Sequence, residues 1–313
     1  MIKPARLIII SSLAIASHAQ GPAHDELDDV LRRADKGRQE YVTGFKDLTA
    51  IETRVTEILD TNGRTEKQQT VVCDFLVYQS KFKGDLVSEY RITREIDGKA
   101  ARHPTDEAMT FFRQLAKANT LAQENQTIRE QNAKHALRFL VFGLSLEPVP
   151  AIRQDSQHDF DFAIVGRERL GERDMVVLGY QSKELRLVAP DYWQVLFKLF
   201  KNPRSGNRGR VWMDAEDWRI RRWVDETLGV DDEITTAAVV ARKEMVYAPD
   251  RLGVLLPQRI VHSTFGKTAG KESPRTLRPL TRIRFTYEAF RRFEVSTATE
   301  IKKPGLDLEP FGN

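Results

Sequence analysis

The spacing of hydrophobic residues changes several times along the 313-residue chain. Near the N-terminus, Leu27, Val30, Leu31 and Ala34 recur at the three- and four-residue spacing of a helix. Acidic residues crowd the start of this segment, where the helix dipole favours negative charge. The pattern therefore predicts an N-terminal amphipathic helix.

The segment that follows alternates with a period of two, which is typical of strands. Ile51, Thr53 and Val55 alternate with polar residues, and Asn62-Gly63 is the strongest short signal for a hairpin turn. Three such segments follow one another, joined by tight turns. This arrangement favours an antiparallel meander over a parallel α/β sheet.

Helical spacing returns between about residues 105 and 147, and we expect a break between two helices in the polar stretch at 119–132. The remainder alternates again and predicts further strands. No internal repeat and no clear linker divides the chain, so we expect one domain over residues 20–313 with a helical insertion at about 105–147. The predicted fold class is α+β, mainly antiparallel β.

Residues 1–19 have the features of a secretory signal peptide. Lys3 and Arg6 form a positive start, an apolar run follows, and small residues end the segment at Ala19. The apolar run is shorter than the ~20 residues that a membrane span needs. We therefore expect cleavage after Ala19 and export to the periplasm or the extracellular space. No later segment is apolar enough to predict an integral membrane protein.

Charge and cysteine content argue against nucleic-acid binding, an internal disulfide and a nucleophilic cysteine. The chain has 49 Lys and Arg against 45 Asp and Glu, and removal of Lys3 and Arg6 lowers the net charge from +4 to +2. Basic and acidic residues are interleaved, whereas a nucleic-acid-binding protein would have a one-sided basic stripe. Cys73 is the only cysteine, so no internal disulfide forms. Its β-rich surroundings favour a small buried thiol over a nucleophile.

The stretch GRVWMDAEDWRIRRWVDETLG, residues 209–229, offers the first candidate chemistry. Asp214, Glu216 and Asp217 cluster where a hairpin turn collects acidic residues, and four arginines flank them. A glycosidase needs two carboxyl groups across a sugar-sized cleft. Adjacent turn carboxylates beside arginines are better explained as cross-strand ion pairs. We expect these acids to be structural.

Other local motifs for catalysis are missing. The histidines of the mature chain lack zinc-site spacing, and a strand at His158 would point that side chain away from Asp159. Ser145 lacks the second glycine of a nucleophile elbow. GNRGR, residues 206–210, precedes a strand and not a helix, so it is no phosphate loop. The sequence thus predicts no catalytic residue, no metal and no cofactor.

Several predicted strands are apolar on both faces, so the sheet must be covered twice or curve around a cavity. By the period of two, Ile220 and Val224 share one face. The alternative to a cavity is a filled sandwich core. If a cavity exists, the candidate ligand-lining residues are Phe75, Val77, Phe160, Phe162, Val211, Met213, Ile220 and Val224.

The layout and three stretches resemble a known family. The stretches are YVTGFKDLTAIETRVTEI (41–58), GRVWMDAEDWRIRRW (209–223) and, more loosely, the strands from Leu255. They are similar to LolA-like lipoprotein carriers, periplasmic proteins with an unclosed β-barrel. The resemblance implies a curved half-barrel with helices covering its open face. No lid arginine of the family can be placed by motif, so we transfer no functional residue.

Three hypotheses about function follow. The first is an exported, non-enzymatic binding protein for a lipid, a lipoprotein acyl chain or another hydrophobic ligand, which requires an apolar and partly unfilled inner surface. The second is an envelope protein–protein interaction module with a filled core, whose partner binds strand edges or the Arg-rich loop at 202–210. The third is a hydrolase that depends on His158 or Asp214.

Overall fold

A computed structural model describes most of the chain after the predicted signal peptide. The described residues are 23–44, 48–79, 82, 87–101, 104–133, 149–187, 204–230, 237–249, 253, 255–267 and 277–292. The predicted cleavage site and the part of the helical insertion after residue 133 lie outside them.

Three α-helices, two short 3-10 turns and twelve strands make up the described part of the chain. Their bounds, in chain order, are α1 (Ala23–Gly44), β1 (Leu48–Leu59), β2 (Thr65–Gln79), β3 (Val87–Ile96), β4 (Lys99–Ala100), α2 (Pro104–Lys117), α3 (Leu121–Ala133), η1 (Pro150–Ile152), η2 (Gln157–Asp159), β5 (Phe160–Leu170), β6 (Arg173–Ser182), β7 (Arg186–Leu187), β8 (Arg204–Asp214), β9 (Ile220–Val230), β10 (Ala238–Pro249), β11 (Leu255–Lys267) and β12 (Leu277–Arg292).

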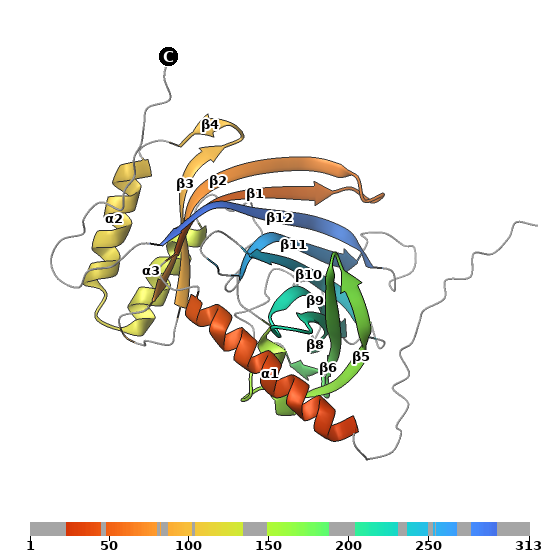
Figure 1. The fold of residues 1–313 in the computed structure, drawn as a ribbon. Coiled ribbons are helices and arrows are strands. Elements are labelled where there is room, and N and C mark those ends of the chain that lie inside the picture. The colour runs from red at the N-terminus through yellow and green to blue at the C-terminus, as the bar shows by residue number, and fades with distance from the viewer. Residues whose placement is uncertain are drawn as a thin grey trace, which may run out of the picture.

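All twelve strands belong to one sheet, in which eleven follow the order β4-β3-β2-β1-β12-β11-β10-β9-β8-β6-β5 and β7 pairs with β8. The pairings are antiparallel. The sheet curves strongly, and no pairing among the described strands joins β5 back to β3 or β4 (Figure 1). The predicted fold class, a mainly antiparallel unclosed barrel with helices, is confirmed.

The face of the sheet that carries the largest core cluster is called the inner face here. Side chains from β1, β2, β6 and β8–β12 meet α1 and η1 in this cluster. The predicted helical stripe is confirmed, because Val30, Leu31 and Ala34 are buried in the cluster and Leu27 packs against it. Helix α1 thus crosses the inner face as a cover (Figure 1).

Helices α2 and α3 take a different position. Phe111 and Leu115 of α2 and Ile128 of α3 form a second cluster with Leu76 and Ile92. On β2, Leu76 points opposite to the neighbouring inner-face residues, because side chains alternate along a strand. These two helices therefore pack on the outer face of β2 and β3. The helix break lies at residues 118–120, earlier than the middle of the polar stretch, because 121–133 is itself helical.

The Asn62-Gly63 hairpin is confirmed. Gly63 has φ 76°, a conformation that favours glycine. The Asp60 side chain accepts hydrogen bonds from the backbone N–H of Asn62 and of Arg64, each at 2.8 Å. Local chemistry therefore closes this turn between β1 and β2.

The segment expected as an Arg-rich loop is not one: from Arg204 onward it is strand β8. Gly206 and Gly209 misled the prediction, because glycine is typical of loops. In the structure they let the strand lie close under neighbouring side chains, those of Leu185 and Tyr180. The partner site placed on this loop by the second hypothesis loses its basis.

Candidate ligand-binding site

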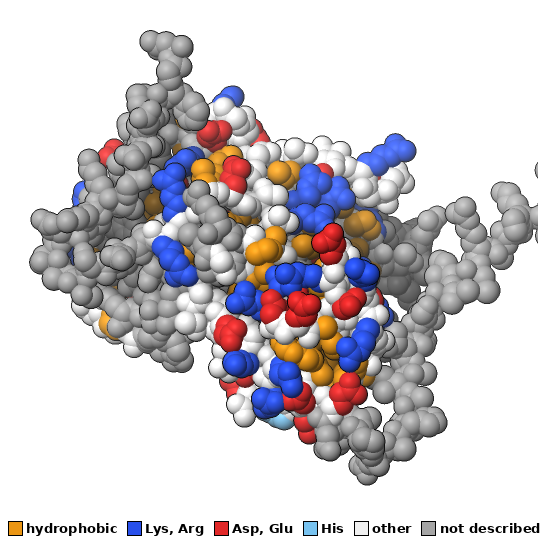
Figure 2. Space-filling model, viewed as in Figure 1, with side chains coloured by type: hydrophobic (Ala, Val, Ile, Leu, Met, Phe, Trp, Pro, Cys, Tyr) orange, Lys and Arg blue, Asp and Glu red, His pale blue; other side chains and the backbone are white. Residues whose placement is uncertain are grey.

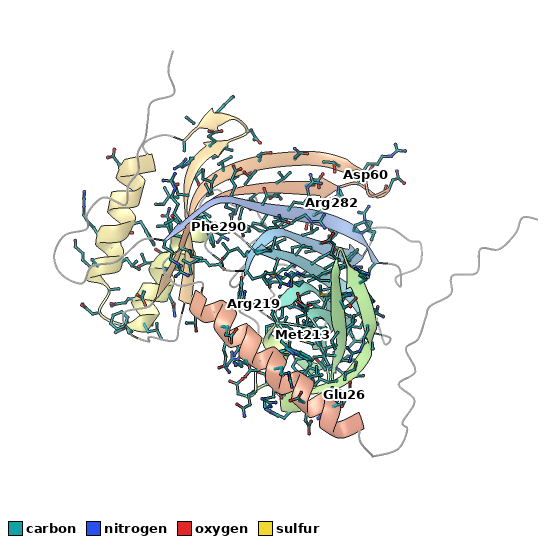
Figure 3. The ribbon with its side chains drawn as sticks, in the orientation of Figure 1. Glu26, Asp60, Met213, Arg219, Arg282 and Phe290 are labelled. Atoms are coloured by element: carbon teal, nitrogen blue, oxygen red, sulfur yellow. The ribbon has the colours of Figure 1, made fainter. Side chains whose placement is uncertain are left out.

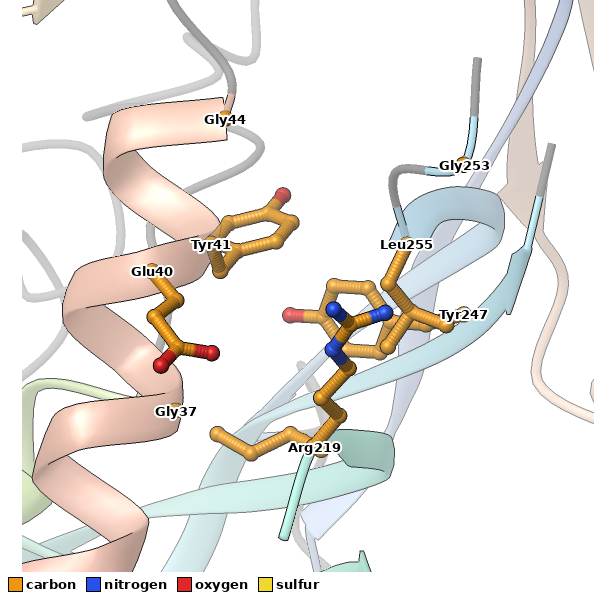
Figure 4. A pocket seen from close by; sticks show the side chains of 9 residues that line it. Gly37, Glu40, Tyr41, Gly44, Arg219, Tyr247, Gly253 and Leu255 are labelled. Atoms are coloured by element: carbon orange, nitrogen blue, oxygen red, sulfur yellow. The ribbon is translucent and has the colours of Figure 1, made fainter. Parts of the chain in front are cut away.

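A pocket of about 190 Å³ lies between the last turns of α1 and the nearby ends of β9, β10 and β11 (Figure 4). We call it the rim pocket. Its lining residues are Gly37, Glu40, Tyr41, Gly44, Arg219, Ile220, Tyr247, Gly253 and Leu255. The pocket is lined by apolar and aromatic side chains together with one acidic residue, Glu40, and one basic residue, Arg219.

Helix α1 comes unusually close to the β8–β9 turn at Gly37. A Cβ atom on Gly37 would lie 2.7 Å from the carbonyl oxygen of Trp218. Trp218 itself has φ 59°, and the guanidinium of Arg33 lies 5.0 Å from its ring centroid. The absence of a side chain at Gly37 therefore allows helix α1 and the β8–β9 turn to pack closely together at one side of the pocket.

Replacing Gly37 by Ala is expected to destabilise the protein by about 2 kcal/mol, because the added methyl meets backbone that cannot rotate away. The sign is informative, since Gly→Ala inside an exposed helix normally stabilises by about 1 kcal/mol. Urea unfolding would measure the difference. Lys36→Ala, on the exposed side of the same helix, serves as the control, and a gain in stability for Gly37→Ala would contradict this packing.

The acidic turn next to the pocket is structural, as the sequence predicted. Asp214 is buried and accepts hydrogen bonds from Arg173 at 2.5 Å, from Arg221 at 3.1 Å and from the backbone N–H of Glu216 at 3.0 Å. Burial opposes its ionisation, but these bonds and charges lower the pKa of the carboxyl. Asp217 binds the same Arg221 at 2.6 Å. Arginines therefore pair with both carboxylates, and Asp214 is also closed to solvent, whereas the Asp217 side chain is 34% exposed.

Two tyrosines form the pocket's side walls. The rings of Tyr41 and Tyr247 meet edge to face, with centroids 5.4 Å apart and an interplanar angle of 86°. Burial raises the pKa of both hydroxyls, so both rings stay neutral. Leu255 and Ile220 are buried and complete an apolar floor. The walls present the mixed surface, apolar with a polar end, that suits an amphiphile.

Most of the predicted lining residues come together on the inner face. Five of the eight belong to its core cluster: Phe75, Val77, Val211, Met213 and Ile220. Phe160 and Phe162 pack against that cluster as partly buried residues. Figure 3 shows Met213 among the strands behind α1 and Arg219 next to the helix. Ile220 also lines the rim pocket, and the binding of a ligand by any of the eight residues stays a prediction.

Val224 does not join this group, so the expectation that it shares a face with Ile220 is wrong. It packs with Met175, Val177 and Trp212 in a separate cluster on the outer face. The cause is an irregularity in the β8–β9 pairing, where successive β8 residues pair with Arg222 and Ile220. The extra residue reverses the alternation. Trp223 takes the inner position instead, and period counting cannot locate such a bulge.

A polar row crosses the apolar inner face, and the sequence reasoning missed it. Cross-strand pairing aligns Tyr180, Gly209, Asp225, Lys243 and His262 on β6, β8, β9, β10 and β11. Each of these residues pairs with the next along the row. A signal was present, because Tyr180, Asp225, Lys243 and His262 stand at inward positions of β6, β9, β10 and β11, but only the register shows that they lie in one row.

Hydrogen bonds tie the centre of this row. The Tyr180 hydroxyl donates to the Asp225 carboxyl at 2.6 Å, and the Asn207 amide donates to its other oxygen at 2.8 Å. The Trp223 indole N–H donates to the Tyr180 oxygen at 2.8 Å. Burial raises the pKa of Asp225 despite these bonds, while the charge of Lys243 acts in the opposite direction.

The His262 imidazole next to Lys243 predicts a loss of stability in acid. Burial, and then the positive charge of Lys243, lower its pKa to about 4 from 6.5. Folding therefore favours the neutral ring, and this stability is lost as the pH falls from 6.5 through 4. At pH 5 the loss is about 2 kcal/mol relative to pH 7.5.

Urea unfolding of the native chain and of His262→Gln at both pH values would test this linkage. The difference in stability between pH 7.5 and pH 5 should be smaller in the variant by about that amount. Asp225 has a raised pKa, acts with the opposite sign and is present in both proteins, so its effect cancels. Equal pH dependence in the two proteins would show that His262 titrates normally.

The other candidate residues of the sequence analysis, Cys73 and His158, form neither a nucleophile nor a metal site in the described structure. Burial raises the pKa of the Cys73 thiol to about 11, which makes it a poor nucleophile. His158 lies on a 3-10 turn and not a strand, so it does contact Asp159, at 3.3 Å, but on the exposed surface. Within the described ranges, no group of His, Cys, Asp and Glu could hold a metal ion.

Side chains of both charges are interspersed over the face of the molecule in Figure 2. This mixture agrees with the interleaved charges of the sequence, and the visible face has no one-signed stripe of the kind that nucleic acid requires. As for membranes, none of the described helices combines the length and the apolar character that crossing a bilayer demands.

No protein-family model and no curated protein matches the sequence. Solved structures do match. A putative outer membrane lipoprotein-sorting protein domain from Vibrio parahaemolyticus is 10% identical with a TM-score of 0.41, over 88% of this chain and 95% of that chain. A LolA superfamily protein from Nitrosomonas europaea is 10% identical with a TM-score of 0.32, over 85% and 94%.

A DUF1329 family protein from Desulfovibrio piger is 9% identical with a TM-score of 0.32, over 85% of this chain and 92% of that chain. LolA superfamily structures are thus among the matches, as the sequence resemblance led us to expect. At such identities and TM-scores these neighbours carry no argument about what this chain binds.

Proposed function

We propose that this chain is an exported, non-enzymatic binding protein whose half-barrel holds a lipid, a lipoprotein acyl chain or another hydrophobic molecule. One observation carries the proposal. The rim pocket opens where an amphipathic helix covers an apolar sheet face, so a ligand chain could replace contacts of the helix.

The size of the pocket defines how such binding would work. Pockets for drug-sized ligands measure about 300–1,000 Å³, whereas the rim pocket measures about 190 Å³. It accommodates the end of a chain but not a whole acyl chain. The inner face beyond it is occupied by side chains of α1, including Val30, Leu31 and Ala34. Binding of a long ligand therefore requires α1 to shift outward.

The absence of enzymatic activity in this proposal rests on the acidic turn. On that turn, arginines bind the carboxylates of both Asp214 and Asp217. Glu40 lines the pocket itself, but its carboxylate is exposed and lies 4.0 Å from the ammonium of Lys36. A general acid or base needs access to the substrate proton. The proposal therefore assigns the pocket to binding alone.

Native mass spectrometry of the freshly purified chain tests the proposal by detecting co-purified lipid. Leu255→Trp is expected to fill the rim pocket and remove both the bound lipid and any thermal stabilisation by added fatty acid. The matched control is Leu170→Trp, at an exposed leucine on the outer edge strand β5. A lipid-free mass for the native chain, with no stabilisation by fatty acid or phospholipid, would overturn the proposal.

A second candidate, an envelope protein-interaction module, has support of its own. Strand β5 lies at the end of the strand order, and its Val165 and Leu170 are exposed apolar residues, at 38% and 39%. An edge strand of this kind can pair with a strand of another protein. Pull-down from envelope extract that recovers one protein without lipid, and loses it in Val165→Lys, would favour this function instead.

A further inference from the structure

Arg219 stands out among the arginines of the acidic turn. Arg173 and Arg221 both bind Asp214, and Arg221 also binds Asp217. The backbone N–H of Arg219 donates to Asp217 at 2.9 Å, but within the described part of the chain no acceptor binds its guanidinium. Figure 4 shows this guanidinium beside Tyr247 and Leu255, directed into the rim pocket.

The position of Arg219 is fixed by its neighbours. The residue before it, Trp218, has φ 59° and is held under α1 at Gly37. The residue after it, Ile220, is buried and begins β9. The backbone therefore presents the Arg219 side chain to the pocket from a rigid hairpin, which limits the entropy lost when a ligand binds.

Glu40 is the other charge that lines the pocket. Its carboxylate lies 4.0 Å from the ammonium of Lys36, one turn earlier on α1, and both side chains are exposed. The lysine offsets part of that negative charge. Among the described residues, the Arg219 guanidinium therefore has no counter-ion in the pocket, whereas the Glu40 carboxylate has Lys36 beside it.

We propose that the rim pocket binds the anionic head group of an amphiphile, a carboxylate or a phosphate, through the Arg219 guanidinium. The inference rests on the proposed function and names its ligand class. A guanidinium presents parallel N–H donors that match two oxygens of one oxyanion. The apolar part of the ligand lies on Ile220 and Leu255, between the rings of Tyr41 and Tyr247.

Three probes with the same ten-carbon chain test the proposal by isothermal titration calorimetry at pH 7: decanoate, decyl phosphate and decanol. The native chain should bind at least one anion about fivefold to tenfold more tightly than decanol. Arg219→Gln should abolish that preference and leave the affinity for decanol unchanged. A preference for only one of the two anions identifies the head group as carboxylate or as phosphate.

Matched controls separate a contact from a structural effect. Glu40→Gln removes the other charge of the same pocket and should not weaken binding of the anions. Arg219→Lys keeps the charge but loses the paired donors, so it should retain part of the preference. Rising NaCl concentration should lower the affinity for the two anions and leave the affinity for decanol unchanged, because salt screens exposed charges.

The outcomes distinguish this inference from the function on which it rests. Equal affinity of the native chain for decanol and both anions would overturn the role of Arg219 and leave hydrophobic binding intact. An anion preference that survives in Arg219→Gln would also overturn it. Failure of all three probes to bind would overturn the proposed function together with the inference.

Discussion

Replacing Glu52 by Gln should cost the folded protein about 3 kcal/mol, because it leaves a buried guanidinium without its main counter-ion. The Arg91 guanidinium donates to both oxygens of Glu52, at 2.7 and 2.8 Å, and to Glu89 at 3.2 Å. Glu52 is fully buried and Arg91 is 7% exposed. The pair lies on the inner face beside Phe75, whose ring centroid is 5.0 Å from the guanidinium.

The electrostatics of this pair explain the size of the effect. Burial opposes the charge of Arg91, but the carboxylates of Glu52 and Glu89 outweigh it and hold the pKa of the guanidinium well above its ordinary value. A guanidinium is protonated at any pH at which the protein is studied, so Arg91 stays charged even when Glu52 becomes neutral. It must then either remain poorly paired in the core or be drawn toward water, and both disturb β1, β2 and β3.

The control for Glu52→Gln is the same change at Glu226. The Glu226 carboxylate lies 2.8 Å from the guanidinium of Arg208, whose side chain is 49% exposed. Exposed pairs contribute about 0–1 kcal/mol, so Glu226→Gln should shift the urea midpoint little. The double change Glu52→Leu with Arg91→Met should recover part of the lost stability, because it removes the buried guanidinium together with its main counter-ion, while Glu89 loses its contact with Arg91. Equal losses for Glu52→Gln and Glu226→Gln would contradict a buried pair.

Elements whose signals are local in sequence could be predicted. The stripe of Val30, Leu31 and Ala34 depends only on helical spacing, and the turn at Asn62-Gly63 depends on two residues. The curvature of the sheet was inferred from strands apolar on both faces and from the resemblance. Each of these features needs no knowledge of which strand pairs with which.

Features that depend on register could not be predicted. Glu52 and Arg91 are 39 positions apart, and only the alignment of β1, β2 and β3 brings them together. In the sequence, a charged residue at an inward position only interrupts the apolar pattern of its strand and does not indicate a buried ion pair. The bulge in β9 likewise leaves no mark in the sequence, yet it moves Val224 to the outer face and Trp223 to the inner face.

The candidate site was predicted in part for the same reason. Ile220 was placed on the correct face because it lies before the bulge. The rim pocket itself was not predicted, since Tyr41, Arg219 and Tyr247 come from three distant segments. Gly37 gave no signal, because a glycine inside a helical pattern indicates only a slightly less stable helix. It does not indicate that another segment packs closely against the helix backbone there.

Gly209 on β8 has the same kind of role inside the half-barrel. Tyr180 on β6 reaches across this glycine to hydrogen-bond Asp225 on β9 at 2.6 Å. A Cβ atom on Gly209 would collide with the Tyr180 hydroxyl and with the backbone carbonyl of Val224. The tyrosine cannot rotate away cheaply, because its oxygen also accepts the indole N–H of Trp223 at 2.8 Å.

Gly209→Ala is therefore expected to destabilise the protein by about 3 kcal/mol or more, because the core is overpacked and the buried Asp225 carboxyl loses one of its two side-chain donors. Urea unfolding measures the loss. Gly266→Ala on β11 is the matched control: its Cβ would lie 2.5 Å from the flexible end of the Leu280 side chain, so it should cost clearly less. The double variant Gly209→Ala with Tyr180→Phe relieves only the clash with the hydroxyl, not those with the ring carbon or with Val224. It should remain destabilised, and full recovery there would refute the backbone contact.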